Sequence, residues 1–293
     1  MKNMKRFSIF ILALIGLACN TSSKPITEND LWTLNLPQGT TSLEQKQQIY
    51  NETKGELILK STSTFTFTKE GNFKTHIQSF PDGSTRSQEY SYDDAGRVIK
   101  ISGNSSAQGL IAITTYSYEG SNPLTIYTTV EGGNNFFPKI VKTYNGKTVV
   151  KEERYGSSGQ LVDLFETKGN IKTHTSYNTS NEVRFKYVYE LQNGREVKKT
   201  RYDAKGNAVD TSENELDAHG NDIASYRLNN GKRSNPVYEY AYLYQNDTWV
   251  IRASKTANDY GSGKTRTITT RSFKGSKNAT PTNTQIMAFI KTL

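Results

Sequence analysis

The sequence predicts an all-β protein, an extended, twisted or curled antiparallel meander of repeated β-hairpins. One observation is the regular recurrence of turn-forming strings, since Gly133, Gly146 and Gly159 lie 13 residues apart. Another is the alternation of apolar and polar residues between these turns, which is the pattern of a half-buried strand. The third is a polar chain, 34% hydrophobic, that still contains 18 tyrosines, as in a sheet with much of its surface in water. A closed barrel or a two-layer sandwich is the alternative.

The repeated hairpins are expected to occupy residues 41–275. The stretch EVRFKYVYEL (182–191) shows the pattern well, because Phe185 and Tyr187 alternate with the charged Arg184 and Lys186. Asn-Gly and Gly-Asn pairs supply the positive φ angles that tight hairpin turns need. Each unit of about a dozen residues is therefore one strand and one turn, and the chain should contain roughly sixteen or more strands.

The first 18 residues predict a lipoprotein signal peptide. Basic residues precede an apolar run, residues 7–18, which is too short to cross a bilayer core of about 30 Å. The run ends at Cys19, the only cysteine of the chain. The stretch IGLAC (15–19) resembles the lipobox of bacterial lipoproteins, and this resemblance implies that Cys19 becomes the acylated N-terminus. An ordinary signal peptide cut nearby, leaving a free thiol, is the other interpretation.

The segments that flank the repeats are expected to cover the ends of the sheet. Residues 19–40 predict a polar tether and a lead-in segment in which Trp32, Leu34 and Leu36 cover the edge of the first strand. Residues 276–293 predict a loop followed by a short edge-covering segment, either an amphipathic helix or an extended stretch. Exposed sheet edges need such cover because they otherwise pair with other chains.

The charge pattern argues against nucleic acid as a partner. The formal net charge is +9, but three of the positive charges belong to the signal peptide, and no block of five or more like charges occurs elsewhere. A nucleic-acid-binding surface needs a clustered basic stripe. We therefore expect the charges to lie on solvated strand faces.

The stretch YSYDDAGRV (90–98) resembles the YD repeat of Rhs-type proteins, in which a Tyr-Asp pair is followed by two spacer residues, then Gly-Arg or Gly-Asn and an aliphatic residue. RYDAKGNAV (201–209) follows the same pattern, and ELDAHGNDI (215–223) follows it with Leu216 in place of the tyrosine. The resemblance covers roughly residues 60–255. It implies a repeat lipoprotein of the bacterial envelope with a β-sheet architecture, and it implies no activity.

The residues that could carry chemistry have structural explanations. The histidines lack metal-ligand spacing and have no second cysteine beside them. The aspartates recur at the turns with the repeat, which marks them as turn formers rather than as an acid–base pair. The sequence therefore predicts no enzyme, no metal site and no cofactor. The residues considered are His76, His174, His219, Asp93, Asp94, Asp203 and Asp217.

The tyrosine stripes are the feature that favours a function. A row of exposed aromatic side chains makes a platform for a glycan or a protein partner. The other interpretation is that the tyrosines form the thin core of a sheet with few aliphatic residues. The densest cluster, and the candidate binding surface, consists of Tyr238, Tyr240, Tyr242, Tyr244 and Trp249.

Together these features predict a non-enzymatic, lipid-anchored protein of the bacterial envelope whose sheet binds a glycan or a protein. The lipoprotein resemblance implies the outer membrane, with the protein facing either the periplasm or the cell surface. One alternative is an immunity protein that binds and neutralises a toxin. A polysaccharide-acting enzyme is a further alternative, which would need a pocket with two carboxylates. The membrane contact is the N-terminal lipid, and the oligomeric state is left open.

Overall fold

The computed structural model describes residues 30, 34, 36–256, 265–275 and 279–292. The described chain forms one antiparallel sheet in which each strand pairs with the next along the sequence. Its strands are β1 (Ser42–Asn51), β2 (Glu56–Phe67), β3 (Phe73–Ser79), β4 (Thr85–Tyr92), β5 (Val98–Ser105), β6 (Gly109–Glu119), β7 (Leu124–Glu131), β8 (Lys139–Asn145), β9 (Thr148–Tyr155), β10 (Leu161–Lys168), β11 (Ile171–Tyr177), β12 (Val183–Gln192), β13 (Arg195–Asp203), β14 (Ala208–Leu216), β15 (Asp222–Asn229), β16 (Lys232–Gln245), β17 (Thr248–Thr256) and β18 (Thr265–Lys274).

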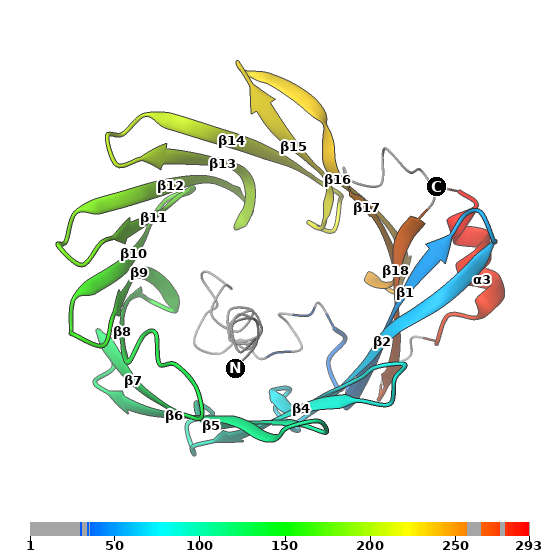
Figure 1. Cartoon of the computed structure of the whole chain (residues 1–293), viewed down its shortest axis with the longest axis horizontal. Helices are drawn as coiled ribbons and strands as arrows, with labels where there is room; N and C mark the ends of the chain where they lie inside the picture. The colour runs from blue at the N-terminus through cyan, green and yellow to red at the C-terminus, as the bar shows by residue number, and fades with distance from the viewer. Residues whose placement is uncertain (1–29, 31–33, 35, 257–264, 276–278, 293) are drawn as a thin grey trace, which may run out of the picture.

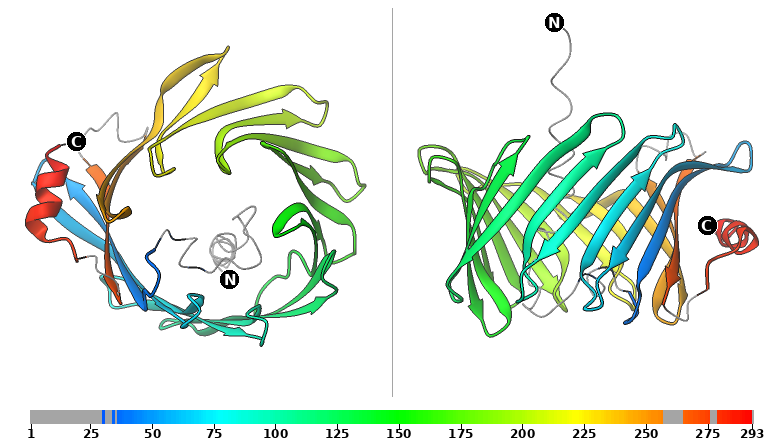
Figure 2. Two further views of the ribbon diagram at one scale, coloured as in Figure 1. Left: turned by 180° about the vertical axis from the view of Figure 1, so that it is seen from behind. Right: turned by 90° about the horizontal axis from the view of Figure 1, so that it is seen from below.

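The sheet closes into a barrel because β18 returns to pair with β1 (Figure 1). The pairing runs along the whole of β1, from Ser42 opposite Lys274 to Asn51 opposite Thr265, while β2 pairs with the other side of β1. The meander is thus confirmed, and the barrel is the alternative that the structure adopts in place of an open sheet. Closure satisfies the backbone groups that two free edges would leave unpaired, and it requires the strand tilt seen in Figure 2.

The turns form as the sequence pattern requires. In the hairpin between β4 and β5, the Asp93 carboxylate accepts hydrogen bonds from the backbone N–H groups of Ala95 (3.1 Å) and Arg97 (2.8 Å). Gly96 has φ 75°, a conformation that few side chains tolerate. The carboxylates of Asp203 and Asp217 accept the same pair of bonds in their own turns. These aspartates therefore shape turns.

The two faces of the sheet are identified by what packs on them at the β18–β1 seam. Arg271 of β18 donates a hydrogen bond of 3.0 Å to the carbonyl oxygen of Leu34, in the blue segment that Figure 1 places inside the ring. On the other face, helix α3 (Asn283–Ile290) lies outside the wall, and its Ile286 lines a small hollow together with Glu44 and Lys46 of β1. The strand register extends this inside–outside assignment around the barrel.

The principal apolar core lies at this seam and not in the lumen. Leu43, Ile251 and Ile268 are fully buried there, and Leu36 covers the seam from the inside. Helix α3 covers it from the outside with two buried isoleucines, Ile286 among them. Away from the seam the wall is a single layer with few buried apolar side chains.

The terminal segments differ from the expectation in one respect. Leu34 and Leu36 were expected to cover the edge of the first strand, but they pack on the seam of a closed sheet, which has no free edge there. The C-terminal segment forms a helix, α3, rather than an extended stretch. The helix begins with a capping box, in which the side chains of Thr282 and Gln285 each accept a hydrogen bond from the other residue's backbone N–H group. Cys19, the signal peptide and Trp32 lie outside the described residues. No helix in the described part of the chain is long and apolar enough to cross a membrane.

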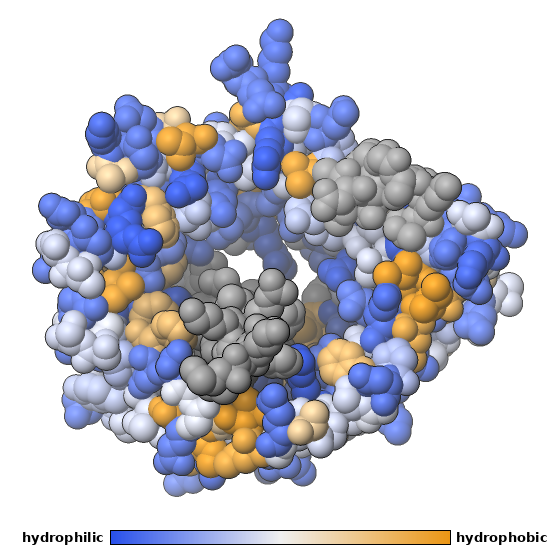
Figure 3. All heavy atoms as spheres, viewed as in Figure 1, coloured by the Kyte–Doolittle hydropathy of each residue, from blue (hydrophilic) through white to orange (hydrophobic). Residues whose placement is uncertain are grey.

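The outer face of the wall is polar. Lys151 and Glu153 of β9 face outward and form an ion pair of 3.0 Å, and Thr173 of β11 and Lys186 of β12 continue this face. Seen down the barrel, most residues are hydrophilic and the hydrophobic ones form separate patches (Figure 3). The outer wall therefore presents hydrogen-bonding and charged groups along much of its circumference.

Candidate functional site

The tyrosine row of β16 lies on the inner wall of the barrel. Tyr242 pairs with Arg252 of β17, which in turn pairs with Thr269 of β18, on the same face as Arg271. The alternation of the strand places the other tyrosines of the row on this face too. Successive rings from Tyr238 to Tyr244 have centroids 6.3, 6.5 and 5.9 Å apart. Closure of the barrel has therefore turned the predicted platform toward the lumen.

Exposure differs along the row. Tyr238 is 42% exposed, whereas Tyr240, Tyr242 and Tyr244 are half-buried. Burial raises the pKa of Tyr242 to about 12, so its hydroxyl remains protonated at neutral pH. That hydroxyl donates a hydrogen bond of 3.0 Å to the carbonyl oxygen of Asp222, which anchors this ring of the row. The tyrosines thus serve as packing groups and as part of the inner surface at once.

Trp249 joins the row from β17 and is itself buried, with 6% exposure. Its ring meets the ring of Tyr242 edge to face at 6.1 Å. Two guanidinium groups lie over it, that of Arg271 at 3.5 Å and that of Arg252 at 5.4 Å. The predicted cluster is therefore brought together, and it has two cationic neighbours that the sequence reasoning missed.

Arg271 is a buried cation held by neutral groups. It is 4% exposed and donates to the carbonyl oxygen of Leu34 at 3.0 Å. With the Gln45 amide oriented so that its oxygen faces the guanidinium, that oxygen accepts from Nε at 2.9 Å and from Nη2 at 3.2 Å. Burial, reinforced by the nearby charge of Arg252, lowers the pKa of Arg271 to about 9. The guanidinium is charged at neutral pH, and no carboxylate of the described residues lies within ion-pair distance of it.

Arg252 is the second cation of this cluster. Its guanidinium lies 5.8 Å from the centre of the Tyr240 ring and 5.4 Å from that of Trp249. Its Nε is buried and has no hydrogen-bond partner. Such an orphaned donor is costly unless another group accepts its hydrogen bond.

Cations over aromatic rings continue along the inner wall. Lys199 of β13 lies 4.3 Å from the centre of the Tyr187 ring of β12. Arg201, two residues further on the same face, lies 5.7 Å from the centre of the Phe185 ring. Within the described chain neither cation forms an ion pair with a carboxylate. The inner wall from β12 to β18 is thus aromatic and carries these cations beside a few carboxylates, such as Asp210 and Asp222.

The inner wall from β8 to β11 is different because its charges neutralise one another. Glu152 forms ion pairs with Arg154 at 2.7 Å and with Lys142 at 3.3 Å. Burial alone would raise the pKa of Glu152, but these two cations outweigh it and the pKa is lowered. Asp163 bonds the imidazole of His174 at 2.8 Å. An anionic ligand would therefore meet uncompensated positive charge only on the β12–β18 side among these walls.

The three histidines lie apart, each stacked on an aromatic ring. His76 stacks on Phe65 and His174 on Phe165, both with centroids 4.2 Å apart, and His219 stacks on Tyr244 at 3.9 Å. Within the described ranges no three metal-binding side chains come together. These rings extend the aromatic packing of the wall.

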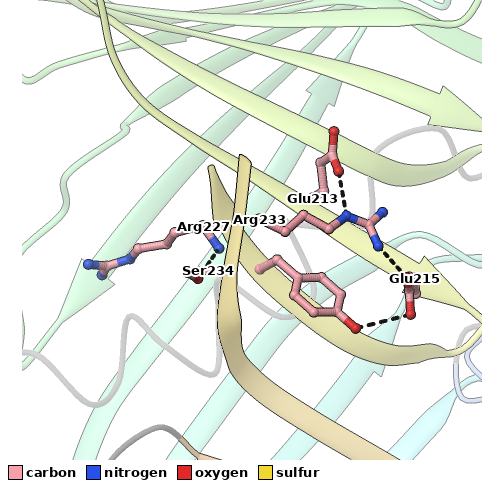
Figure 4. A network of polar contacts seen from close by, with 6 residues as sticks. Glu213, Glu215, Arg227, Arg233 and Ser234 are labelled. Carbon is pink, nitrogen blue, oxygen red and sulfur yellow. Dashed lines mark hydrogen bonds and ion pairs between the residues drawn. The ribbon is translucent and has the colours of Figure 1, made fainter. Parts of the chain in front are cut away.

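A hollow of about 620 Å³ lies among β12–β15 and their turns, with Arg233 of β16 at its border. Arg233 pairs with Glu213 at 2.9 Å and also with Glu215, which accepts a hydrogen bond from the Tyr226 hydroxyl (Figure 4). Arg227 points away from this network (Figure 4). The charged groups of the network satisfy one another, so the hollow offers no free charge from them to a ligand.

The cations of the tyrosine cluster could not be found from local sequence. Arg252 follows Trp249 by three residues, but the bulge between Leu243 and Tyr244 in the pairing of β16 with β17 puts both side chains on the inner face. Arg271 approaches Trp249 only because β17 and β18 pair in a particular register. The sole local signal was an arginine within a strand pattern beside an aromatic stripe.

No family model matches the chain, and no curated protein sequence matches it. Among the solved structures that match is a porin-like protein from Bacteroides uniformis, with a TM-score of 0.40 and 11% identity over 81% of this chain and 97% of that one. The complex TcdB2-TccC3 matches with a TM-score of 0.25 and 12% identity over 73% of this chain and 15% of that one. A DUF1329 family protein from Desulfovibrio piger matches with a TM-score of 0.23 and 9% identity, over 82% and 88% of the two chains. The functional argument accordingly rests on the residues of this chain.

Proposed function

We propose that this protein is a non-enzymatic carbohydrate-binding barrel of the bacterial envelope that takes a glycan along its inner wall. The observation that carries the proposal is the row from Tyr238 to Tyr244, four tyrosines on one strand facing the lumen with Trp249 beside them. Aromatic rings offer apolar area to the carbon faces of sugars, and the tyrosine hydroxyls offer hydrogen bonds to sugar hydroxyls. A concave aromatic surface with a few polar groups is the usual form of a ligand site.

The inward position of the row favours a glycan over a folded protein partner. A linear oligosaccharide can lie along a strand inside a barrel, whereas a folded domain would need a platform on the outside. The acidic side chains of the facing wall support binding without turnover. Glu152 is held between Arg154 and Lys142, and Asp163 is bonded to His174, so both are engaged in structural pairs.

The platform is tested by the double substitution Tyr240→Ala and Tyr242→Ala. Each ring contributes roughly 0.5–1.5 kcal/mol of aromatic contact, so we expect the affinity for a bound glycan to fall about tenfold or more. Calorimetric titration of the purified barrel against oligosaccharides identified on a glycan array measures this change. Tyr127→Ala is the matched control, since Tyr127 lies on the outer face and is 37% exposed.

Two experimental results would contradict the proposed glycan platform. A folded wild-type protein that binds no member of a broad glycan array would overturn it. Equal losses from Tyr127→Ala and from the inner double variant would show that the inner row is not the site.

The lipid anchor is part of the proposal and accounts for how a polar-walled barrel stays at a membrane. A barrel that spans a bilayer presents an apolar band to lipid, whereas the outer face here carries pairs such as Lys151–Glu153. We infer that the barrel stands in water and is held at the membrane through acylated Cys19. A single acyl chain binds only marginally, so the anchor needs the several chains of a bacterial lipoprotein.

Cys19→Ala is expected to move the protein from the membrane fraction to the soluble fraction and to abolish incorporation of labelled fatty acid. Fractionation of cells that express the full chain measures both. Ser22→Ala is the matched control and should leave the protein in the membrane fraction. A Cys19→Ala protein that stayed fully membrane-bound would contradict the anchor.

A further inference from the structure

We propose that the glycan is acidic and that Arg252 and Arg271, beside Trp249, form the subsite for its carboxylate groups. This inference rests on the proposed function, because the subsite adjoins the tyrosine row that would hold the sugar rings. The distances that define it are 3.5 Å from the Arg271 guanidinium to the centre of the Trp249 ring and 5.4 Å from that of Arg252.

The inner wall near the subsite carries an excess of positive charge. From β13 to β18 the register places basic side chains on the inner face of every strand but β14. Carboxylates on this face include Asp210, Asp222 and Glu196, of which Glu196 already pairs with Lys172. Figure 4 shows that Arg227 of β15 points away from the ion pairs of Arg233. The inward basic residues of these strands are Lys199, Arg201, Arg227, Lys232, Arg252 and Arg271.

Among the described residues, the guanidinium groups of Arg252 and Arg271 have no carboxylate within ion-pair distance. Buried charges are usually paired, because the loss of hydration is otherwise large. Arg271 is 4% exposed, yet its partners in the described part of the chain are a backbone carbonyl, an amide oxygen and an indole ring. Arg252, its cationic neighbour, keeps a buried Nε without a partner. A bound anion would supply both the missing charge and the missing acceptor.

The form of the cations favours a carboxylate. A guanidinium binds a carboxylate through two parallel hydrogen bonds, and its plane stacks on aromatic rings. Trp249 therefore holds the Arg271 guanidinium in a fixed plane, and the Leu34 carbonyl restricts it further. On the facing wall the cations are already neutralised by carboxylates, as Arg154 is by Glu152, and offer no free charge to an anion. The charge asymmetry would thus align an acidic sugar against the β16–β18 side.

The ligand charge is tested with one sugar backbone in two forms. We expect oligogalacturonate to bind the wild-type barrel at least tenfold more tightly than the same oligomer fully methyl-esterified. Its affinity should also fall with added salt, because salt screens the attraction between the free acidic oligomer and the cations of the inner wall. Equal affinities for acid and ester would overturn the inference and leave the carbohydrate platform standing.

The subsite is tested with Arg252→Gln, since Arg252 is less buried than Arg271 and does not belong to the apolar core cluster at the seam. We expect the variant to lose most of the tenfold preference for the acid over the ester. Arg184→Gln, on the exposed outer face of β12, is the matched control and should keep the preference. The double variant of Tyr240 and Tyr242 should lose affinity for acid and ester alike, which separates failure of the platform from failure of the subsite.

A third sugar distinguishes the kinds of anion. A sulfated galactan oligomer carries the same sign of charge without the planar carboxylate. Weaker binding of this oligomer than of oligogalacturonate supports the carboxylate assignment. Tighter binding of the sulfated oligomer, or an unchanged acid preference in Arg252→Gln, would overturn it.

Discussion

Leu43→Ala is expected to lower the free energy of unfolding by about 3 kcal/mol, as for other fully buried leucines. Leu43 is 0% exposed and faces Phe273 of β18 on one side and Phe65 of β2 on the other. It belongs to the core cluster at the seam where the barrel closes. A cavity at this point would therefore weaken the apolar packing where the two ends of the sheet meet.

Chemical denaturation followed by circular dichroism measures this loss. Leu110→Ala removes the same atoms from a side chain that is 59% exposed, and should change stability by less than about 0.5 kcal/mol. A Leu43→Ala protein as stable as the Leu110→Ala control would show that the seam is not the core that holds the barrel shut.

The barrel is also expected to unfold as the pH rises above about 10, with a stability loss of at least about 2 kcal/mol by pH 12. Burial raises the pKa of Tyr90 to about 12, with help from the charge of Asp30, and burial likewise raises that of Tyr242 to about 12. The pKa values of Tyr92, Tyr189 and Tyr244 are raised in the same way.

The direction of this change in stability depends on whether the folded or the unfolded state binds more protons. A tyrosine whose pKa is higher in the folded state contributes stability that is present below the unfolded value, about 10, and is lost as the pH rises through the folded value. Arg271 acts in the opposite direction, because its folded pKa of about 9 lies below its unfolded value. Its contribution therefore increases the free energy of unfolding as the pH rises above about 9. The tyrosines outnumber this one arginine, and the net change is a loss.

Denaturation curves collected at several pH values between about 8 and 12, together with tyrosinate absorbance, test this expectation. Several tyrosines should ionise only as the fold is lost, in one cooperative step. Stability that was constant or rising from pH 10 to 12 would contradict the burial of these hydroxyls. Tyr242→Phe should shift the step to higher pH, because it removes one of the groups that must ionise.

The local elements were predictable because short-range rules decide them. The turn of YSYDDAGRV forms because Asp93 bonds two backbone N–H groups and Gly96 takes a positive φ, and both needs are visible in the sequence. The expected sixteen or more strands are confirmed by the 18 of the structure. The resemblance to YD repeats stays a prediction, as does acylation of Cys19.

The candidate site was predictable only in part. Alternation along β16 placed Tyr238, Tyr240, Tyr242 and Tyr244 on one face, and they do share one. Their direction relative to the lumen depended on closure, and the approach of Arg271 to Trp249 depended on a register that no local pattern encodes. The cations that give the site its charge were therefore absent from the prediction.

The sequence by itself determined an antiparallel meander of hairpins, because period-two alternation and positive-φ turns act within about a dozen residues. Only the tertiary structure decided that the meander closes and which face becomes the lumen. That decision rests on contacts between distant segments, such as Thr41 with Lys274 and Leu34 with Arg271. Such pairing is set by the summed twist of 18 strands and by the apolar seam under helix α3, neither of which a local pattern contains.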